Sequence, residues 1–405
     1  MSVDRLKLHV IPITIPENFY TYILINEGGE PLIYPTRWLM RKRLNHPVSA
    51  GTIQMEMYHL SFLYRWAYEK HWIHLDQYFI QNDIADTQML DSLVDYVRTH
   101  THHKDRSRLN AQPFRARMTT IFQFLNFCLY RAHRGGELNA HEQAIMMRKS
   151  DRYREYHEEL LAHIRVNKGK WKGRSPLTDE EIIKIRDAIA PRQNEHGEWI
   201  FNAFSKRTAL RNWLFFLMGQ YLGLRRGEIL NIKRTDIPNG PMPRLRIVEH
   251  LGDPADTRMR KPALKTSERV LPLQRELRNT LKAYLTFTPQ KGGRPQSPSP
   301  YLFLTEDGAP MSISTAYKVS QKIRLLSDVE TFTWHKLRHT WATRVYKLLC
   351  DQEGGERMLK QMAGWRTDTM LEHYAEEAIT ERANAHLVEY IDAIFPEHQS
   401  TEAFS

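Results

Sequence analysis

The sequence predicts a mainly α-helical protein with a small antiparallel β-sheet (an α+β fold), divided into two main domains. Its 405 residues are enough for two or three domains of ordinary size. Apolar residues recur at helical spacing in most long segments, whereas strand-like segments are short and few. Hydrophobic residues make up 41% and charged residues 26% of the chain. This composition is typical of a globular protein with apolar cores and excludes a mainly disordered chain.

Positive charge is in excess in both parts of the chain. Lys and Arg number 58 against 47 Asp and Glu, a formal net charge of +11. Residues 1–174 hold 25 basic and 18 acidic residues and residues 175–405 hold 33 and 29, so the two parts contribute +7 and +4. This excess favours a polyanionic partner, either nucleic acid or an acidic membrane surface. Two basic parts suit a protein that closes around its partner from two sides.

Simple sequence features disfavour several other classes of protein. The two cysteines, Cys128 and Cys350, do not form a disulfide framework typical of secreted proteins, and neither lies in a zinc-binding spacing. No apolar run reaches the roughly 18–20 residues of a membrane span. Residues 1–12 lack the apolar core of a signal peptide. We therefore expect a soluble cytoplasmic protein.

The first domain is expected to be helical after a short β segment. Residues 6–34 contain two runs rich in β-branched and aromatic residues, with a glycine-rich turn signal after the second. Apolar residues at helical spacing predict a helix that starts at Ser49 or Thr52 and runs to about Lys70. The same spacing predicts a helix over residues 117–132.

Two basic segments are candidates for contact with a phosphate backbone. Residues 102–117 contain a single acid, Asp105, and form either a solvated loop or a DNA contact. Residues 165–176 contain no acid and are rich in glycine, which predicts a flexible basic linker between the domains. The candidate DNA-binding residues are Lys104, Arg106, Arg108, Arg115 and Arg117 in the first segment and Lys168, Lys170, Lys172 and Arg174 in the second.

The second domain is expected to combine helices with the small sheet. Thr178 precedes three acidic residues, which predicts a capped helix start. The apolar run at 213–224 predicts a further helix. Strand-like runs at the two ends of residues 244–273 predict a hairpin with its turn near Lys265, and residues 301–304 are a candidate for one more strand.

Two segments of this domain pair charged residues at helical spacing. Arg225 and Glu228 are three residues apart, so Glu228 can hold the Arg225 guanidinium in place to grip two phosphate oxygens, although a purely structural pair is the alternative. His335 and Arg338 have the same spacing and can together hold an oxyanion and move a proton. A zinc site at His335 and His339 is disfavoured because no acidic third ligand lies nearby.

Two other segments, around Lys265 and Tyr374, indicate a function only when they are considered together with the two segments above. Lys265 begins the segment K-T-S-E-R-V-L-P-L, and a lone lysine at a turn is ordinarily just exposed. Tyr374 lies nine residues after Trp365, and a lone tyrosine is ordinarily a packing residue.

Taken in order, these four segments resemble the motifs of the tyrosine recombinase (phage integrase) family. The first arginine box of the family is similar to G-L-R-x-G-E-I-L, and its lysine hairpin is similar to K-T-x-x-R-V-L-P-L. The histidine–arginine box is similar to H-x-x-R, and the final box is similar to A-G-W followed by Tyr374. The resemblance covers roughly residues 36–395. It implies a catalytic set of Arg225, Lys265, His335, Arg338, Trp365 and Tyr374, supported by Glu228.

The Trp365 position departs from the commonest family pattern, which has His there. Trp offers one N–H donor and cannot carry a proton back and forth. Trp365 is therefore expected to position the phosphate and the nucleophile, and proton transfer rests on Lys265 and His335. Lys261 is the alternative for the lysine position because it lies close by in the sequence.

The resemblance implies a site-specific recombinase or integrase that cleaves and rejoins duplex DNA. Tyr374 would form a covalent 3′-phosphotyrosyl intermediate, Lys265 would protonate the leaving 5′ oxygen, and no metal or other cofactor is needed. The outcome would be integration, excision or inversion of a DNA element. The alternatives are a type IB topoisomerase-like or telomere-resolvase-like strand transferase, and a catalytically idle DNA-binding regulator of the same fold.

The implied organisation places a helical core-binding domain before a mixed α/β catalytic domain. We expect a β-rich extension at 1–35, the core-binding domain at 36–164, the linker at 165–176, the catalytic domain at 177–395 and a tail at 396–405. A C-terminal helix at about 376–395 carries an apolar stripe of Ile379, Ala383, Leu387, Ile391 and Ile394. This stripe packs either on its own domain or on a neighbouring protomer in a DNA-bound homo-tetramer. The expected partners are double-stranded DNA with specific recombination sites and accessory DNA-bending or directionality proteins. When bound to DNA, the protein would be associated with the nucleoid.

Overall fold

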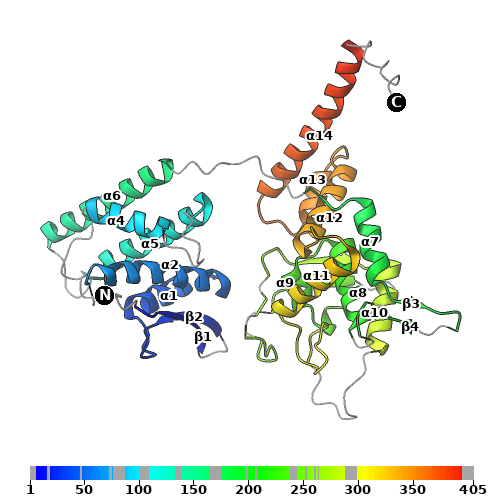
Figure 1. Cartoon of the computed structure of the whole chain (residues 1–405), viewed down its shortest axis with the longest axis horizontal. Helices are drawn as coiled ribbons and strands as arrows, with labels where there is room; N and C mark the ends of the chain where they lie inside the picture. Colours follow the sequence, from blue (N-terminus) through cyan, green and yellow to red (C-terminus); the bar gives the residue numbers. More distant parts are fainter. Residues whose placement is uncertain are drawn as a thin grey trace. The chain divides into compact units, whose positions relative to one another are not determined.

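The chain forms two compact units, residues Met1–Gly173 and Arg174–Ser405, in the computed structural model (Figure 1). The division falls inside the basic segment in which the sequence predicts a linker. The described residues are 6–15, 19–45, 48–72, 75, 87–99, 109–132, 139–163, 175–196, 199–201, 203–205, 208–237, 244–250, 253–259, 261–262, 264–287 and 299–394. Each unit is considered by itself below.

The first unit begins with a β-hairpin. Strands β1 (His9–Ile15) and β2 (Phe19–Ile25) pair antiparallel, with His9 opposite Ile25 and Ile15 opposite Phe19. The glycine-rich turn signal follows β2, where Gly29 has a φ of +83° and donates its backbone N–H to Asn26. The predicted β segment is therefore present, and its second strand packs on helix α2 (Ala50–Glu69).

Three helices of 20–24 residues and two helices of 13 residues complete the described part of the first unit. They are α1 (Ile33–Asn45), α2, α4 (Thr87–Thr99), α5 (Ala111–Ala132) and α6 (Ala140–His163). The Ser49 hydroxyl caps α2 by accepting from the backbone N–H of Thr52, as its sequence predicts. Helix α5 begins at Ala111 and not at residue 117, so the end of the basic segment 102–117 is helical. A buried cluster that includes Trp38, Leu60, Trp66, Phe114 and Phe124 joins these helices.

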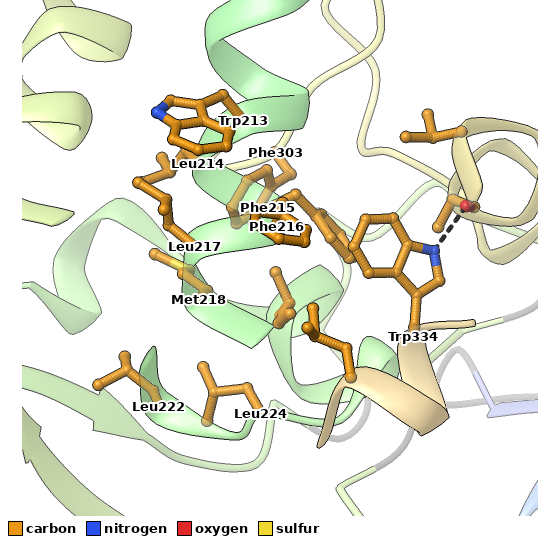
Figure 2. Packing of buried hydrophobic residues seen from close by; sticks show 14 of the residues in the cluster. Trp213, Leu214, Phe215, Phe216, Leu217, Met218, Leu222, Leu224, Phe303 and Trp334 are labelled. Carbon is orange, nitrogen blue, oxygen red and sulfur yellow. Dashed lines mark hydrogen bonds between the residues drawn. The ribbon is translucent and has the colours of Figure 1, made fainter. Parts of the chain in front are cut away.

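Helix α8 (Ala209–Leu222) is the centre of the second unit. Nearly all of its side chains are buried, as expected for a helix that is apolar on every face. Phe215 packs against Phe303 and Trp334 with ring centroids 5.1 and 4.6 Å apart (Figure 2). The Trp334 indole N–H donates to the Ala316 carbonyl at 2.8 Å, so this large ring is buried with its polar atom satisfied.

Helices α9 (Arg226–Asn231), α10 (Arg275–Phe287) and α12 (Trp334–Leu349) pack on α8. Arg186 of α7 (Asp179–Ile189) bonds to Gln220 of α8, and α11 (Ile313–Ser327) packs on α7 and α9. Thr178 begins α7 with a capping box, since its hydroxyl accepts from the Glu181 N–H while the Glu181 carboxylate accepts from the Thr178 N–H. The sequence prediction of this helix start is confirmed.

The predicted hairpin of the second unit is present as strands β5 (Arg244–Ile247) and β6 (Arg269–Pro272). They pair antiparallel with Leu245 opposite Leu271. Strands β3 (Arg192–Gln193) and β4 (Trp199–Ile200) form a second, very short pair that the sequence analysis did not foresee. The expectation of a strand at 301–304 is wrong, because Tyr301 and Leu304 form only isolated bridges, to Lys233 and Pro310.

Two helices end the described chain. Helix α13 spans Gly355–Ala363 and α14 spans Thr369–Ile394. Helix α14 therefore begins earlier than the predicted 376 and contains Tyr374. The fold is mainly helical with small antiparallel sheets, as the sequence predicts. Within the described ranges, no helix combines the length and the apolar character that crossing a membrane requires.

Candidate active site

A buried carboxylate, that of Glu228, organises the candidate site. Helix α8 ends at Gly223 in the left-handed conformation, and α9 starts at Arg226. The Glu228 side chain accepts a hydrogen bond from the backbone N–H of Arg225 at 2.7 Å, which closes the start of α9. Glu228 is only 2% exposed, so its charge needs compensation from inside the protein.

Three guanidinium groups supply that compensation. The Arg269 Nη2 lies 3.1 Å from Glu228, the Arg338 Nη1 lies 3.6 Å away and the Arg225 Nη1 lies 3.9 Å away. Burial by itself would raise the pKa of the Glu228 carboxyl, but the charges of Arg269 and Arg338 hold this pKa below its ordinary value. The sequence predicts a Glu228–Arg225 pair, and the structure adds two further arginines to the same carboxylate.

Arg338 ties together two segments that are distant in sequence. Its Nη1 donates to the Gly223 carbonyl at 2.6 Å and its Nη2 to the Ala363 carbonyl at 2.9 Å. Burial, followed by the charge of Arg225, lowers the pKa of Arg338 to about 9. Both Arg225 and Arg338 also interact electrostatically with Tyr374, which places the candidate nucleophile near the two cations.

Arg225 is the more accessible of these two cations. Its side chain is 29% exposed, against 4% for Arg338. Its Nη1 is nevertheless buried and has no hydrogen-bond partner among the described residues. Burial lowers the pKa of Arg225, although Glu228 opposes this shift. Arg225 can therefore present donors to an incoming oxyanion.

Trp365 and Tyr374 lie against each other at one side of this cluster. Both side chains are buried, and their rings stack with centroids 5.4 Å apart and an interplanar angle of 14°. Trp365 lies between α13 and α14, and its Nε1 is a buried donor that has no hydrogen-bond partner in the described structure. A donor held in this way is available to a ligand oxygen.

His335 and Lys265 present exposed side chains. His335 is the second residue of α12, whose start is capped by the Thr333 hydroxyl accepting from the Lys336 N–H at 2.9 Å. Lys265 lies before β6 between two buried residues, Leu264 and Thr266. Both side chains can thus reach a substrate that approaches from solvent. The alternative lysine, Lys261, donates to the Asp253 carbonyl at 3.3 Å.

The structure adds residues that the sequence analysis did not select. The buried His339 ring meets the Tyr374 ring edge to face, with centroids 5.3 Å apart. Its position four residues after His335 on one helix was the available signal. Arg269 and Thr266 contact Glu228 from the lysine segment, and their place in K-T-S-E-R-V-L-P-L was the only local sign of a role.

The structure separates two of the candidate DNA-binding arginines. Arg115 on α5 is exposed. Arg117 is 7% exposed, stacks on the Phe62 ring at 3.5 Å and donates to the Val97 carbonyl at 3.3 Å. Burial lowers the pKa of Arg117 to about 10. The structure therefore makes Arg115 a better candidate for a DNA contact than Arg117, because the Arg117 guanidinium is part of the core of its own unit.

The remaining candidate DNA-binding residues lie outside the described residues. They are Lys104, Arg106 and Arg108 in the first basic segment and Lys168, Lys170, Lys172 and Arg174 in the second. In the ranges that the structure describes, no three His, Cys, Asp or Glu side chains come together in a group that could hold a metal ion.

Comparisons with known proteins show what the second unit is similar to. Residues 199–381 match the model of the Phage integrase family. The Tn1549 transposon integrase, solved with circular intermediate DNA, has a TM-score of 0.51 to this chain at 15% identity, covering 87% of this chain and 100% of that one. The XerH site-specific recombinase, solved bound to palindromic difH substrate, has a TM-score of 0.42 at 16% identity, with coverages of 84% and 97%.

A comparison with curated proteins gives no match. The matched range, residues 199–381, includes every catalytic residue predicted above. The 0.51 structural likeness shows that the fold is shared. Residues 199–381 therefore form a phage integrase domain within the second unit.

Proposed function

We propose that this protein is a site-specific DNA recombinase that breaks and rejoins DNA through Tyr374. The observation that carries the proposal is the position of Tyr374, which is buried and stacks on Trp365. Its ring also meets the ring of His339 on α12, the helix that carries Arg338. The Tn1549 integrase, whose fold is similar, was solved with circular intermediate DNA, which supports DNA as the substrate class.

The cleavage step is a transesterification at one phosphodiester. The Tyr374 oxygen attacks phosphorus, a Tyr–O–P bond forms, and the bond from phosphorus to the 5′ oxygen breaks. His335 accepts the phenolic proton, and Lys265 donates a proton to the leaving 5′ oxygen. The product is a 3′-phosphotyrosyl link, and the reverse attack by a 5′ hydroxyl rejoins DNA without an external energy source.

The negative charge that develops on the non-bridging oxygens needs fixed donors. Arg225 and Arg338 supply guanidinium groups, and the Trp365 N–H supplies one neutral donor. Glu228 holds the arginines in place before the substrate arrives, so little reorganisation is needed at the moment of reaction. The nucleophile acts in cis in this scheme, because Tyr374 and the cations belong to one chain.

Assembly on DNA is proposed to use the C-terminal helix. In α14 the stripe residues Ile379, Ala383, Leu387, Ile391 and Ile394 are all exposed. Figure 1 shows this half of α14 continuing beyond the neighbouring helix α13 of the same unit. An exposed apolar stripe favours packing on a second copy over packing on its own domain. A homo-tetramer on two duplexes, assisted by accessory proteins, would use this contact.

The same proposal assigns the basic surfaces to DNA. Arg115 and the basic residues of segments 102–108 and 165–174 would contact the phosphate backbone, while the catalytic unit holds the scissile phosphate. The integration, excision or inversion outcome would follow from the arrangement of the target sites. The protein would then be located with the DNA of its cell.

The experiment removes only the nucleophilic oxygen. Tyr374→Phe keeps the ring that packs on Trp365, so the variant should fold and bind DNA. With a nicked suicide substrate, wild type should give a covalent protein–DNA adduct that survives denaturing electrophoresis, and Tyr374→Phe should give none. An adduct of normal yield in the variant would overturn the nucleophile assignment.

A further inference from the structure

The segment that carries Lys265 is anchored at both of its neighbouring residues. Leu264 belongs to the hydrophobic core of the second unit. Thr266 is 1% exposed, and its hydroxyl donates to Glu228 Oε1. The backbone at Lys265 is therefore fixed from both sides, while the side chain between them is exposed.

Arg269 also holds the lysine segment in place, through hydrogen bonds to four residues. Its Nη1 and Nη2 donate to the two Glu228 oxygens at 3.3 and 3.1 Å. Nη1 also lies 3.1 Å from the Thr266 hydroxyl and 3.3 Å from the Ser267 carbonyl. Its Nε donates to the Met362 carbonyl at 2.9 Å. The five N–H donors of a guanidinium form a rigid planar fork that can reach these acceptors on several sides, whereas an ammonium group lacks such a fork.

Further bonds join the lysine segment to the segment of Trp365. The Ser267 N–H donates to the Gly364 carbonyl at 3.0 Å, and the Arg366 Nη2 donates to the Thr266 carbonyl at 3.3 Å. Gly364 has a φ of +68°, and a Cβ there would lie 2.6 Å from Arg269 Nη1. The two segments thus fit together so closely that only glycine is accommodated at this point.

We propose that Thr266 and Arg269 are positioning residues that fix the general acid Lys265 relative to the phosphate cradle. They do so through Glu228, which is the same carboxylate that holds Arg225 and Arg338. The proposal rests on the proposed recombinase function, because it assumes that Lys265 protonates the leaving oxygen. Neither residue contacts the reacting atoms, and each acts through the backbone of the lysine segment.

The position of an acid is critical because a displacement of about 1 Å can cost on the order of 10²-fold in rate. Thr266→Val removes one hydroxyl at nearly constant volume, and Arg269→Lys keeps the charge but loses the fork. Both should bind the target DNA with wild-type affinity and cleave it about 10²-fold more slowly in single-turnover assays.

The decisive test is a suicide substrate with a 5′-bridging phosphorothiolate, whose sulfur leaves without protonation. On this substrate Thr266→Val should regain nearly all of its lost rate, and Arg269→Lys should regain most of it. Lys265→Ala is the reference variant and should be rescued in the same assay. Arg258→Lys is the matched control, because Arg258 is also buried and forms a bidentate pair with the carboxylate of Asp256. This variant should cleave both substrates nearly as fast as wild type does.

The outcomes separate the two ideas. If Lys265→Ala is rescued but Thr266→Val and Arg269→Lys stay slow, these residues do not position the acid and the inference is overturned. If Lys265→Ala is not rescued, the acid assignment itself is wrong and the inference falls with it. If Arg269→Lys does not fold, Thr266→Val alone decides, since it changes only one hydroxyl.

Discussion

The indole ring of Trp365 and the phenol ring of Tyr374 stack nearly parallel, with centroids 5.4 Å apart. The stack places a buried indole N–H next to Tyr374, the proposed nucleophile, and this N–H bonds to no atom of the described residues. The family usually has His at this position. In the proposed mechanism, Trp365 supplies a donor and a packing surface but cannot transfer a proton.

Trp365→Phe should show how much the indole N–H contributes to catalysis apart from the packing of the ring. Phe preserves the stack on Tyr374 but has no N–H, and loss of one preorganised donor costs about 10²-fold in rate. Single-turnover adduct formation should therefore fall by about this factor at unchanged DNA affinity, and Trp365→His should recover part of it. Wild-type cleavage by Trp365→Phe would mean that the indole N–H does not bind the phosphate.

Glu228→Gln should destabilise the catalytic unit. The substitution leaves Arg225, Arg269 and Arg338 close together without their shared carboxylate, and breaking a buried ion pair costs about 3–5 kcal/mol. Urea unfolding followed by circular dichroism should show a much lower midpoint. Glu276→Gln is the control, because Glu276 pairs with Arg186 at 2.7 Å but is 38% exposed, so the loss should stay near 1 kcal/mol or below. Equal midpoints for the two variants would contradict the central role of Glu228.

Gly223→Ala should destabilise the same unit for a steric reason. Gly223 has a φ of +59°, and a Cβ there would lie 2.1 Å from the Trp341 ring. The left-handed backbone and the overlap together should cost about 3 kcal/mol. Gly308→Ala has a similar φ of +82° with no atom within 4 Å of the added Cβ, so it should cost only about 1 kcal/mol. The difference between the two unfolding free energies isolates the contact with Trp341, and the absence of a difference would refute it.

The stability of the first unit should fall in mild acid because of His59. Burial, followed by the charge of Arg117, lowers the pKa of His59 from 6.5 to about 4. Between pH 6.5 and pH 4, His59 is protonated in the unfolded state but neutral in the folded state. The free energy of unfolding therefore decreases as the pH falls from about 6.5 towards 4. At pH 5 the loss from this group should be about 2 kcal/mol relative to pH 7.5. In urea unfolding at the two pH values, His59→Gln should lack this part of the loss, and an unchanged pH dependence would exclude His59 as its source.

Short-range patterns in the sequence were sufficient to predict much of the local structure. The caps at Ser49 and Thr178 and the hairpin that precedes Arg269 follow from residues within a few positions of each other. The order of the four motif boxes carried the family resemblance, and the choice of Tyr374 and its neighbouring cations as catalytic residues remains a prediction from that resemblance. Expectations failed where the local pattern was weak, as for the strand at 301–304.

Tertiary structure alone decided which charges act together. Arg269 and Glu228 are 41 residues apart in the chain, and Arg338 and Gly223 are 115 apart, so no helical or strand periodicity links them. Arg115 and Arg117 are equally basic in the sequence, yet one is exposed and the other is buried on Phe62. Sequence by itself determines which side chains carry charge and which local face they occupy. Burial and the choice of partner depend on packing between distant segments, and that packing places Arg225, Arg269 and Arg338 on the single carboxylate of Glu228.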